Sequence, residues 1–326
     1  MESLPLEITS NVLLRLSVKT LGQLRCVSKT LTTSPYFTKT HHNQIPSAQR
    51  RYQLLLSASS LHTLNIFHNN TPPVYLRLPS NAIKKYCGAT HELVGSCNGL
   101  VCIYYPPNNY SLLNPTTREL RLLPNPETLP LDARARLHGF GYVSKFDDYM
   151  IVSIGTDESV IRVFSAKADL WKTVSTSVPL PVLPWVKPVY VNNVVHWLGN
   201  FDVGEYQFRP VHHIMGFDFV DEEFKVLPLC EDLNQRLITT LGVLGGDFCV
   251  LSRGVDDNMN LDMWVMKEYG VGESWIRILL LPVYPNLPFV SLSPICPAGI
   301  YGTVHGILFL ADSRCLLFYD FVNYMT

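Results

Sequence analysis

The hydrophobic pattern after residue 50 most strongly limits what this chain can fold into. From there on, apolar and polar residues alternate in short runs such as "LVCIYY", "YMIVSI" and "VVHWLG". Gly, Asn, Asp and Pro separate these runs, and few segments show helical spacing. The pattern therefore predicts a mainly β structure over most of the 326 residues.

The strand-like runs also repeat. The segment "NGLVCIYYPPNNYSLLNPTTRELRLLP" contains a turn, a strand, a polar loop, a second strand, a turn and Leu-Pro, and "NNVVHWLG…HHIMGFDFVDEEFKVLPL" follows the same order. Leading strands begin near residues 53, 100, 149, 194, 248 and 307. The interval is roughly 45–60 residues, the size of a four-stranded propeller blade. An aromatic residue late in a unit is expected to cover the edge between neighbouring blades, and the candidates are Trp171, Phe224 and Trp275.

The last copy of the repeat, "HGILFLADSRCLLFYDF", stands close to the end of the sequence. We therefore expect a short C-terminal end, with a last blade completed by strands from residues 52–78. Such pairing between the two ends would close the ring and leave no free strand edge.

The N-terminal segment "LPLEITSNVLLRLSVKTLGQLRCVSK" has apolar residues at helical spacing instead. Pro5 suits a first helical turn, and Ser17 can cap a second helix. About three short helices are expected over residues 4–42, too small a unit to be comfortably stable alone. Their surplus apolar surface indicates a partner. The residues expected to contact that partner are Leu4, Pro5, Ile8, Val12, Leu13, Leu16, Val18, Leu21, Leu24 and Val27.

Composition argues against several classes of protein. The chain has 26 basic and 27 acidic residues and a net charge of −1, which argues against a nucleic-acid partner. Its 8 cysteines lack zinc-ligand spacing, so no metal site is expected. No apolar run reaches the roughly 18 residues of a membrane span, and the N-terminus lacks the pattern of a signal peptide. We expect a cytoplasmic or nuclear protein without a membrane partner or a cofactor.

The motifs that resemble reactive sites have simpler structural interpretations. Gly95–Gly99 has the G-x-C-x-G spacing of a nucleophile elbow, but a strand follows it, so a tight turn is favoured. The pair Asp147-Asp148 is expected in a solvated turn. The pairs His41-His42 and His212-His213 have no third ligand at a fixed spacing. His196 is expected to be a buried histidine that packs between blades, and no catalytic residue is predicted.

Two segments resemble a known family. The N-terminal segment looks like an F-box, through Leu4-Pro5, Glu7-Ile8, Leu16, Val18-Lys19 and the Arg25–Lys29 core. Ser17 stands where proline is usual, and Leu31 replaces the usual tryptophan. The segments "GSCNGLVCIYY", "LLNPTTRELRLLP", "VYVNNVVHWLG", "IMGFDFVDEEFKVLPL" and "DMWVMKEYGVGESW" are similar to the plant F-box-associated domain, of the type 1/3 kind.

The resemblance implies a three-helix F-box over residues 1–45 and a propeller-like, kelch-like F-box-associated domain over residues 50–326, so that the fold is α+β overall. It also implies a non-catalytic substrate-receptor subunit of an SCF-type ubiquitin ligase. The F-box would bind a Skp-family adaptor, which bridges to a cullin and a RING subunit. The β domain would bind a target protein for ubiquitination.

Two alternatives remain open at this point. One is a propeller-type enzyme or small-molecule-binding protein, and the other is a non-degradative or defective F-box protein. If the chain is a receptor, the target contacts should fall on loops. The longest polar loops are Tyr105–Tyr110, Asn125–Arg136, Asn200–Arg209 and Arg253–Asn260. The third carries interface-type residues, and the substrate-binding candidates are Phe201, Tyr206, Phe208 and Arg209.

Overall fold

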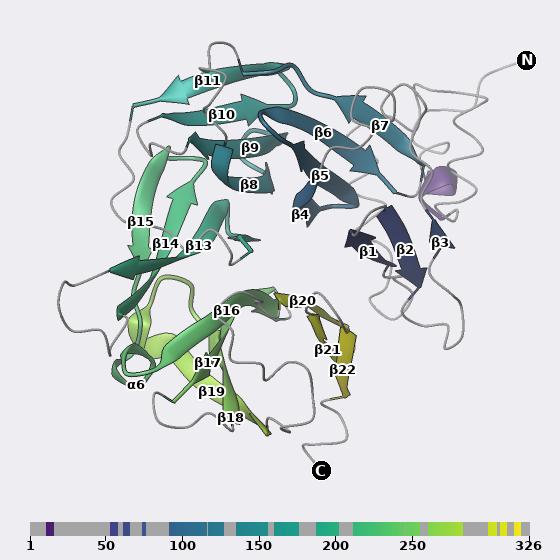
Figure 1. The fold of residues 1–326 in the computed structure, drawn as a ribbon. Coiled ribbons are helices and arrows are strands. Elements are labelled where there is room, and N and C mark those ends of the chain that lie inside the picture. The colour runs from purple at the N-terminus through teal and green to yellow at the C-terminus, as the bar shows by residue number, and fades with distance from the viewer. Residues whose placement is uncertain are drawn as a thin grey trace, which may run out of the picture. The chain divides into compact units, whose positions relative to one another are not determined.

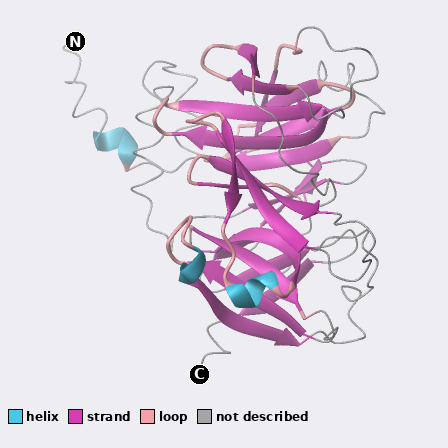
Figure 2. Ribbon diagram, turned by 90° about the vertical axis from the view of Figure 1, so that its left-hand side faces the viewer, coloured by secondary structure: helices cyan, strands magenta, loops and turns pink. Residues whose placement is uncertain are grey.

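The computed structural model describes residues 11–15, 53–57, 61–65, 74–75, 91–115, 117–126, 135–155, 160–175, 187–201, 211–244, 246–254, 260–282, 299–304, 307–311 and 316–320. Almost all of these residues lie in antiparallel strands or in the turns between them (Figures 1 and 2). The expected mainly β fold is confirmed. The chain divides into two units, residues 1–83 with 114–120, and residues 84–113 with 121–326.

Four sheets of four strands form the best-described part of the second unit. Sheet I contains β4 (Glu92–Cys97), β5 (Leu100–Tyr105), β6 (Asn109–Asn114) and β7 (Glu119–Leu122). Sheet II contains β8 (Ala135–Val143), β9 (Asp148–Gly155), β10 (Ile161–Ser165) and β11 (Leu170–Val174). Sheet III contains β12 (Val189–Val191), β13 (Val194–Phe201), β14 (Val211–Asp218) and β15 (Glu223–Leu227). Sheet IV contains β16 (Leu237–Leu244), β17 (Asp247–Arg253), β18 (Asn260–Met266) and β19 (Trp275–Pro282).

The remaining elements are shorter. One three-stranded sheet contains β1 (Gln53–Ser57), β2 (Leu61–Asn65) and β3 (Val74–Tyr75). Another contains β20 (Gly299–Val304), β21 (Ile307–Ala311) and β22 (Leu316–Asp320). The helix α6 (Glu231–Asn234) lies between sheets III and IV in the chain, and the 3-10 turn η2 (Gly272–Ser274) precedes β19. Residues 11–14 form one helical turn. The rest of the expected three-helix unit, and His41-His42, lie outside the described residues.

Three hydrophobic clusters join the four sheets, one at each junction. The first joins sheets I and II, with Tyr110 and Phe164 among its members. The second joins sheets II and III around Trp197. The third joins sheets III and IV around Phe248 and Trp275. Each junction, called a seam below, is therefore a dry face-to-face packing of two sheets, which is how propeller blades bury both of their faces.

The predicted leading strands proved to be the second strands of the sheets. Those expected near residues 100, 149, 194 and 248 are β5, β9, β13 and β17. The sequence reading missed the first strand of each sheet, and it joined β12 to β13 as one run, although Asn192 and Asn193 turn the chain between them. Both asparagines have positive φ (53° and 67°), as a two-residue hairpin turn requires.

The first strands were missed because close packing restricts their side chains. On β8, a Cβ added to Gly139 would lie 2.3 Å from a Val195 methyl, and one added to Gly141 would lie 2.1 Å from the Tyr190 ring. Glycine at these positions lets sheet II approach sheet III. It also removes the apolar residues that would have marked a strand in the sequence.

Candidate functional site

Each of sheets I–IV has a turn end and a loop end. At the turn end, a short turn joins the first strand to the second and the third strand to the fourth. At the loop end, the second strand connects to the third, and the fourth connects to the next sheet. Turn-end residues of neighbouring sheets contact one another: the Tyr190 hydroxyl donates to the Tyr142 carbonyl, Lys172 pairs with Glu222, and Arg121 pairs with Asp169. The turn ends of sheets I, II and III therefore face the same way.

All four polar loops singled out from the sequence belong to loop ends. They connect β5 to β6, sheet I to sheet II, β13 to β14, and β17 to β18. Phe201 is the last residue of β13 and is paired with Val211. The side chain of Phe201 and the whole of Tyr206, Phe208 and Arg209 lie outside the described residues. These four residues remain predicted substrate contacts.

The predicted adaptor contacts are described at only two positions. Val12 and Leu13 belong to the helical turn of residues 11–14, where Val12 is 56% exposed and Leu13 is partly buried. An apolar side chain this exposed has surface left for a partner. The other eight residues of that set lie outside the described part of the chain, so their role stays a prediction.

The aromatic residues expected to cover blade edges do so. The indole N–H of Trp171, on β11, donates to the Pro124 carbonyl of the preceding sheet at 2.7 Å. In the same way Trp275, on β19, donates to the Pro228 carbonyl of sheet III at 2.9 Å. Phe224 packs against the cluster between sheets II and III. In the two Trp cases, the indole ties the outer strand of one sheet to the Leu-Pro step that ends the sheet before it.

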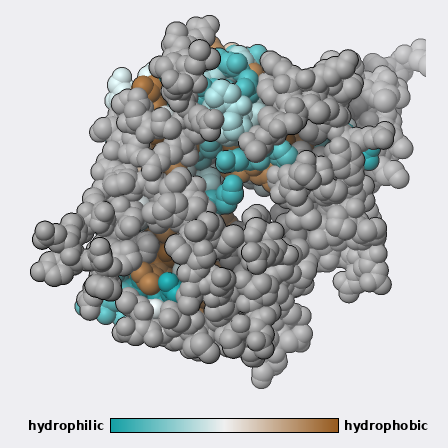
Figure 3. All heavy atoms as spheres, viewed as in Figure 1, coloured by the Kyte–Doolittle hydropathy of each residue, from teal (hydrophilic) through white to brown (hydrophobic). Residues whose placement is uncertain are grey.

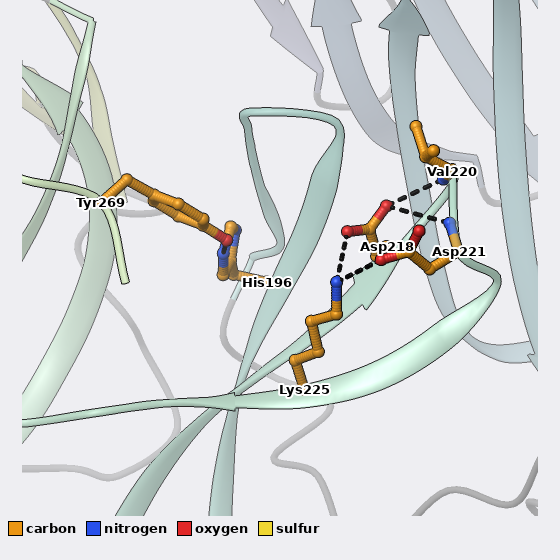
Figure 4. Close-up of polar contacts among 6 residues, drawn as sticks. All are labelled: His196, Asp218, Val220, Asp221, Lys225 and Tyr269. Atoms are coloured by element: carbon orange, nitrogen blue, oxygen red, sulfur yellow. Dashed lines mark hydrogen bonds and ion pairs between the residues drawn. The ribbon is translucent and has the colours of Figure 1, made fainter. Parts of the chain in front are cut away.

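His196 is a buried histidine that joins sheets III and IV, as predicted. Its Nδ1 lies 3.1 Å from the Val189 carbonyl, and its Nε2 lies 2.8 Å from the Tyr269 hydroxyl (Figure 4). A carbonyl oxygen only accepts, so Nδ1 carries the proton and Nε2 accepts from Tyr269. Burial lowers the pKa of His196 to about 4, although the Val189 carbonyl and Asp218 oppose the shift. The ring is therefore neutral at pH 7.

The seam between sheets I and II contains a similar polar contact. The Tyr110 hydroxyl lies 2.8 Å from His138 Nδ1 and donates to Ser153 Oγ, also at 2.8 Å. Burial lowers the pKa of His138 to about 3, with a smaller contribution from the charge of Lys187. Burial also raises the pKa of Tyr110 well above its usual value. Both groups stay neutral across the physiological range, which suits a structural contact between sheets.

The turn between β14 and β15 is organised by one carboxylate. Asp218 accepts from the backbone N–H groups of Val220 (2.8 Å) and Asp221 (3.3 Å), and it pairs with Lys225 at 2.8 Å (Figure 4). Burial alone would raise the pKa of Asp218, but the Lys225 ammonium and the two N–H donors together hold it below its usual value. The same contacts raise the pKa of Lys225. The carboxylate is thus fully used in holding the turn.

The G-x-C-x-G segment forms a β-hairpin, as favoured from the sequence. Cys97 ends β4, Asn98 and Gly99 form the turn with positive φ (48° and 80°), and β5 follows. Burial raises the pKa of Cys97, with a smaller opposing effect from a backbone hydrogen bond of Tyr142. A thiol that resists ionisation is a poor nucleophile, so this segment lacks both the geometry and the thiolate of an elbow.

The expectation of a solvated Asp147-Asp148 pair was wrong for one partner. Asp147 is exposed in the turn, whereas Asp148 is buried. Asp148 accepts from the Ser165 hydroxyl and, at 2.9 Å, from the Lys167 backbone N–H. It therefore fixes the turn after β10 from the neighbouring strand. The pattern gave no warning, because turn carboxylates are usually solvated.

Sequence reasoning also missed a buried charge in sheet IV. Asp262, only 1% exposed, interrupts the apolar strand "NLDMWVM" and contacts both Arg236 and Arg277. A lone acid inside such a run was the available signal, because a buried carboxylate needs a cation. Within the described residues, no group of three or more His, Cys, Asp or Glu side chains could hold a metal ion.

The described surface is mixed in character. The described atoms visible in Figure 3 are partly hydrophilic (teal) and partly hydrophobic (brown), and neither kind forms one continuous area there. A few large apolar side chains are exposed, among them Phe146, Leu170, Val226 and Ile276. No helix in the described part of the chain is long and apolar enough to cross a membrane.

The buried histidines predict a loss of stability in mild acid. The pKa of His196 is about 4 in the folded protein and about 6.5 when unfolded, so the unfolded chain binds the proton more tightly. The stabilisation is complete above pH 6.5 and falls as the pH drops toward 4. We expect urea unfolding to show a decrease of about 2–3 kcal/mol for His196 over this window. His196→Gln should flatten this part of the pH profile. An unchanged slope in that variant would contradict the assignment.

Comparisons with known proteins agree with this geometry. Residues 53–302 match the family model of the F-box associated beta propeller domain, and residues 1–32 match the F-box domain. The F-box protein CPR1 of Arabidopsis thaliana is 28% identical over 311 residues, covering 85% of this chain and 73% of its own. The F-box/kelch-repeat protein At3g23880 of the same plant is 28% identical, covering 86% and 80%.

Solved structures are more distant. The β-propeller domain of Cps50 (Swd1) from Myceliophteria thermophila has 8% identity and a TM-score of 0.42, covering 84% of this chain and 81% of its own. The N-terminal domain of Nup159 has 9% identity and a TM-score of 0.41, covering 82% and 72%.

Proposed function

Because this chain belongs to the F-box proteins that carry an F-box associated β-propeller domain, we propose that it is a substrate receptor of an SCF-type ubiquitin ligase. F-box proteins generally have this role. The N-terminal F-box would bind a Skp-family adaptor, and a cullin and a RING subunit would join through that adaptor. The observation that carries the proposal is the order of the two matched regions, with a docking segment followed by a β domain that can hold a target.

The receptor would act by proximity. Holding a target beside a ubiquitin-charged enzyme raises the effective concentration of its lysines and requires no bond-making by the receptor. The described side chains suit this non-catalytic role. Burial raises the pKa of the thiols of Cys97 and Cys249, the latter to about 12. His138 and His196 are used in contacts between sheets.

The target would bind at the loop end. The turn end consists of short hairpins that contact one another across the seams, such as Tyr190 on Tyr142 and Glu222 on Lys172. The connections at the loop end are longer and include every polar loop selected from the sequence. Loops on a rigid sheet scaffold can vary without loss of the fold. The loop between β13 and β14, with Phe201, Tyr206, Phe208 and Arg209, is the first candidate.

A loop exchange tests this assignment. Replacing residues 202–210 with the corresponding loop of a relative that captures a different target should change which proteins co-purify. Adaptor binding should stay the same, because the F-box is untouched. The measurement is affinity purification with mass spectrometry, with and without proteasome inhibition. An unchanged set of targets would remove this loop from the proposed target surface.

The same experiment separates the proposal from its alternatives. A degradative receptor should retain more target when the proteasome is inhibited, whereas a non-degradative F-box protein should not. An enzyme or small-molecule binder would show no dependence of its activity on the adaptor. We place the protein in the cytoplasm or nucleus, where these ligases and their targets meet, and imaging of a fluorescent fusion would test this.

A further inference from the structure

The outer strands of sheets I–IV each carry a cation, and the four cations differ in their partners. Arg121 on β7 pairs with exposed Asp169, and Lys172 on β11 pairs with Glu222. Lys225 on β15 pairs with two acids, Asp218 and Asp221. On β19, Arg277 shares the single acid Asp262 with a second arginine, Arg236. Only this last group, among the four, carries a net positive charge.

The carboxylate at the centre of this group is deeply buried. Asp262 is 1% exposed, while the side chains of Arg236 and Arg277 are 20% and 48% exposed. Arg277 Nη2 lies 2.6 Å from Asp262 Oδ1, and Arg236 contacts Oδ2. Ser252 Oγ accepts from Arg236 Nε and from the Trp264 indole N–H, both at 3.0 Å. The two guanidinium groups are therefore held in place before any ligand arrives.

A β-bulge places Arg277 in this group. The register of β18 and β19 shifts between Met263 and Trp264, so that Met263 faces Leu279 while Trp264 faces Arg277. The extra residue, Ile278, breaks the alternation of side chains along β19. Arg277 consequently lies on the same face as Trp264 and Asp262 instead of the opposite one. Bulges often serve to redirect a side chain in this way.

The backbone of β19 adds a second binding element. In the hydrogen-bonded order of its sheet, β19 is the outermost strand. An outer strand presents unpaired N–H and C=O groups, to which an extended peptide can add as a further strand. Next to this edge, Ile276 is 42% exposed and gives an apolar contact for the incoming chain.

We propose that the outer edge of β19, with Arg277 and Arg236, binds an extended acidic peptide segment of a partner protein. The charge count selects the chemistry. Two guanidinium groups less one buried carboxylate leave one positive charge, which one Asp or Glu side chain neutralises, whereas a phosphate dianion would leave an excess of negative charge. Because Asp262 already orients Arg277, little side-chain freedom is lost on binding. The inference rests on the proposed function, since the segment would belong to the target.

Peptide binding to the purified full chain, in complex with a Skp-family adaptor, tests the proposal. The probes are fluorescein-labelled Ser-Ile-Thr-X-Thr-Ile-Ser peptides, with X as Glu, Gln or phosphoserine, followed by anisotropy. We expect the Glu peptide to bind about tenfold or more tightly than the Gln peptide, as a charge-assisted hydrogen bond implies. Arg277→Gln should remove this preference. Hydrogen exchange in β19 should slow when the Glu peptide is added, while exchange in β11 stays the same.

Arg121→Gln is the matched control, because its side chain is also 48% exposed on an outer strand but pairs with an exposed acid. It should leave the preference for Glu intact. Equal binding of the Glu and Gln peptides, or a preference that survives Arg277→Gln, would overturn the proposal, as would tighter binding of the phosphoserine peptide. These outcomes leave adaptor co-purification untouched, so they are distinguishable from a failure of the proposed function.

Discussion

A chain carrying Leu16→Ala and Leu21→Asp is expected to lose co-purification with a Skp-family adaptor. Both leucines lie on the apolar faces of the expected F-box helices. Burying a leucine side chain is worth roughly 1.5–3 kcal/mol, and placing an unpaired carboxylate in an apolar contact costs several more. Together the changes should weaken the complex by roughly a thousandfold or more. The measurement is pull-down of the adaptor by the tagged chain.

The control separates lost docking from lost folding. Leu170→Asp changes a leucine that is 52% exposed on β11, far along the chain from the F-box, and it should leave adaptor binding intact. The thermal unfolding of the β domain should be the same in the double variant and in the unaltered chain. Adaptor capture at the original level by the double variant would refute the F-box assignment itself.

The variant Trp197→Ala is expected to destabilise the β domain more than any surface change. Trp197 is 1% exposed in the cluster between sheets II and III, and its indole N–H donates to the His138 carbonyl at 3.1 Å. Truncation of a buried tryptophan costs about 3–5 kcal/mol through lost transfer energy and the cavity that remains. In a domain of this size the melting temperature should fall by about 2–4 °C per kcal/mol.

A conservative variant shows whether the volume or the hydrogen bond matters. Trp197→Phe fills most of the space but removes the N–H donor to the His138 carbonyl, so it should cost about 1–3 kcal/mol. Leu170→Ala, on the exposed side of β11, should change stability little. If Trp197→Ala were no more destabilising than Leu170→Ala, the seam between sheets II and III could not be a main source of stability.

Much of the architecture could be predicted from local sequence. The second strands of the sheets were visible because they are buried on both faces and read as apolar runs, as in β5, β9 and β17. The hairpin turns at Asn98-Gly99 and Asn192-Asn193 were visible because positive φ selects Asn and Gly. The edge-covering role of Trp171 and Trp275 followed from their place late in each repeat.

The candidate site was less predictable. The sequence selected loops at the ends of strands, and it was the order of strands in the sheets that brought those loops to the loop ends. The residues named there, apart from the backbone of Phe201, and most of the predicted adaptor contacts lie outside the described residues, so they stand as predictions. The family itself was identified from the sequence, because F-box and repeat motifs are local patterns.

By itself, the sequence determined the family, the β repeat and the turns, since each depends on residues close together in the chain. Only the tertiary structure decided which polar groups are buried and which partners they take. Asp148 and Asp147 are neighbours with opposite exposure, because Ser165 and Lys167 meet one of them from the next strand. Arg277 reaches Asp262 because a one-residue bulge turns it onto that face. Burial and bulges depend on what packs from elsewhere in the chain, and a linear pattern does not contain that information.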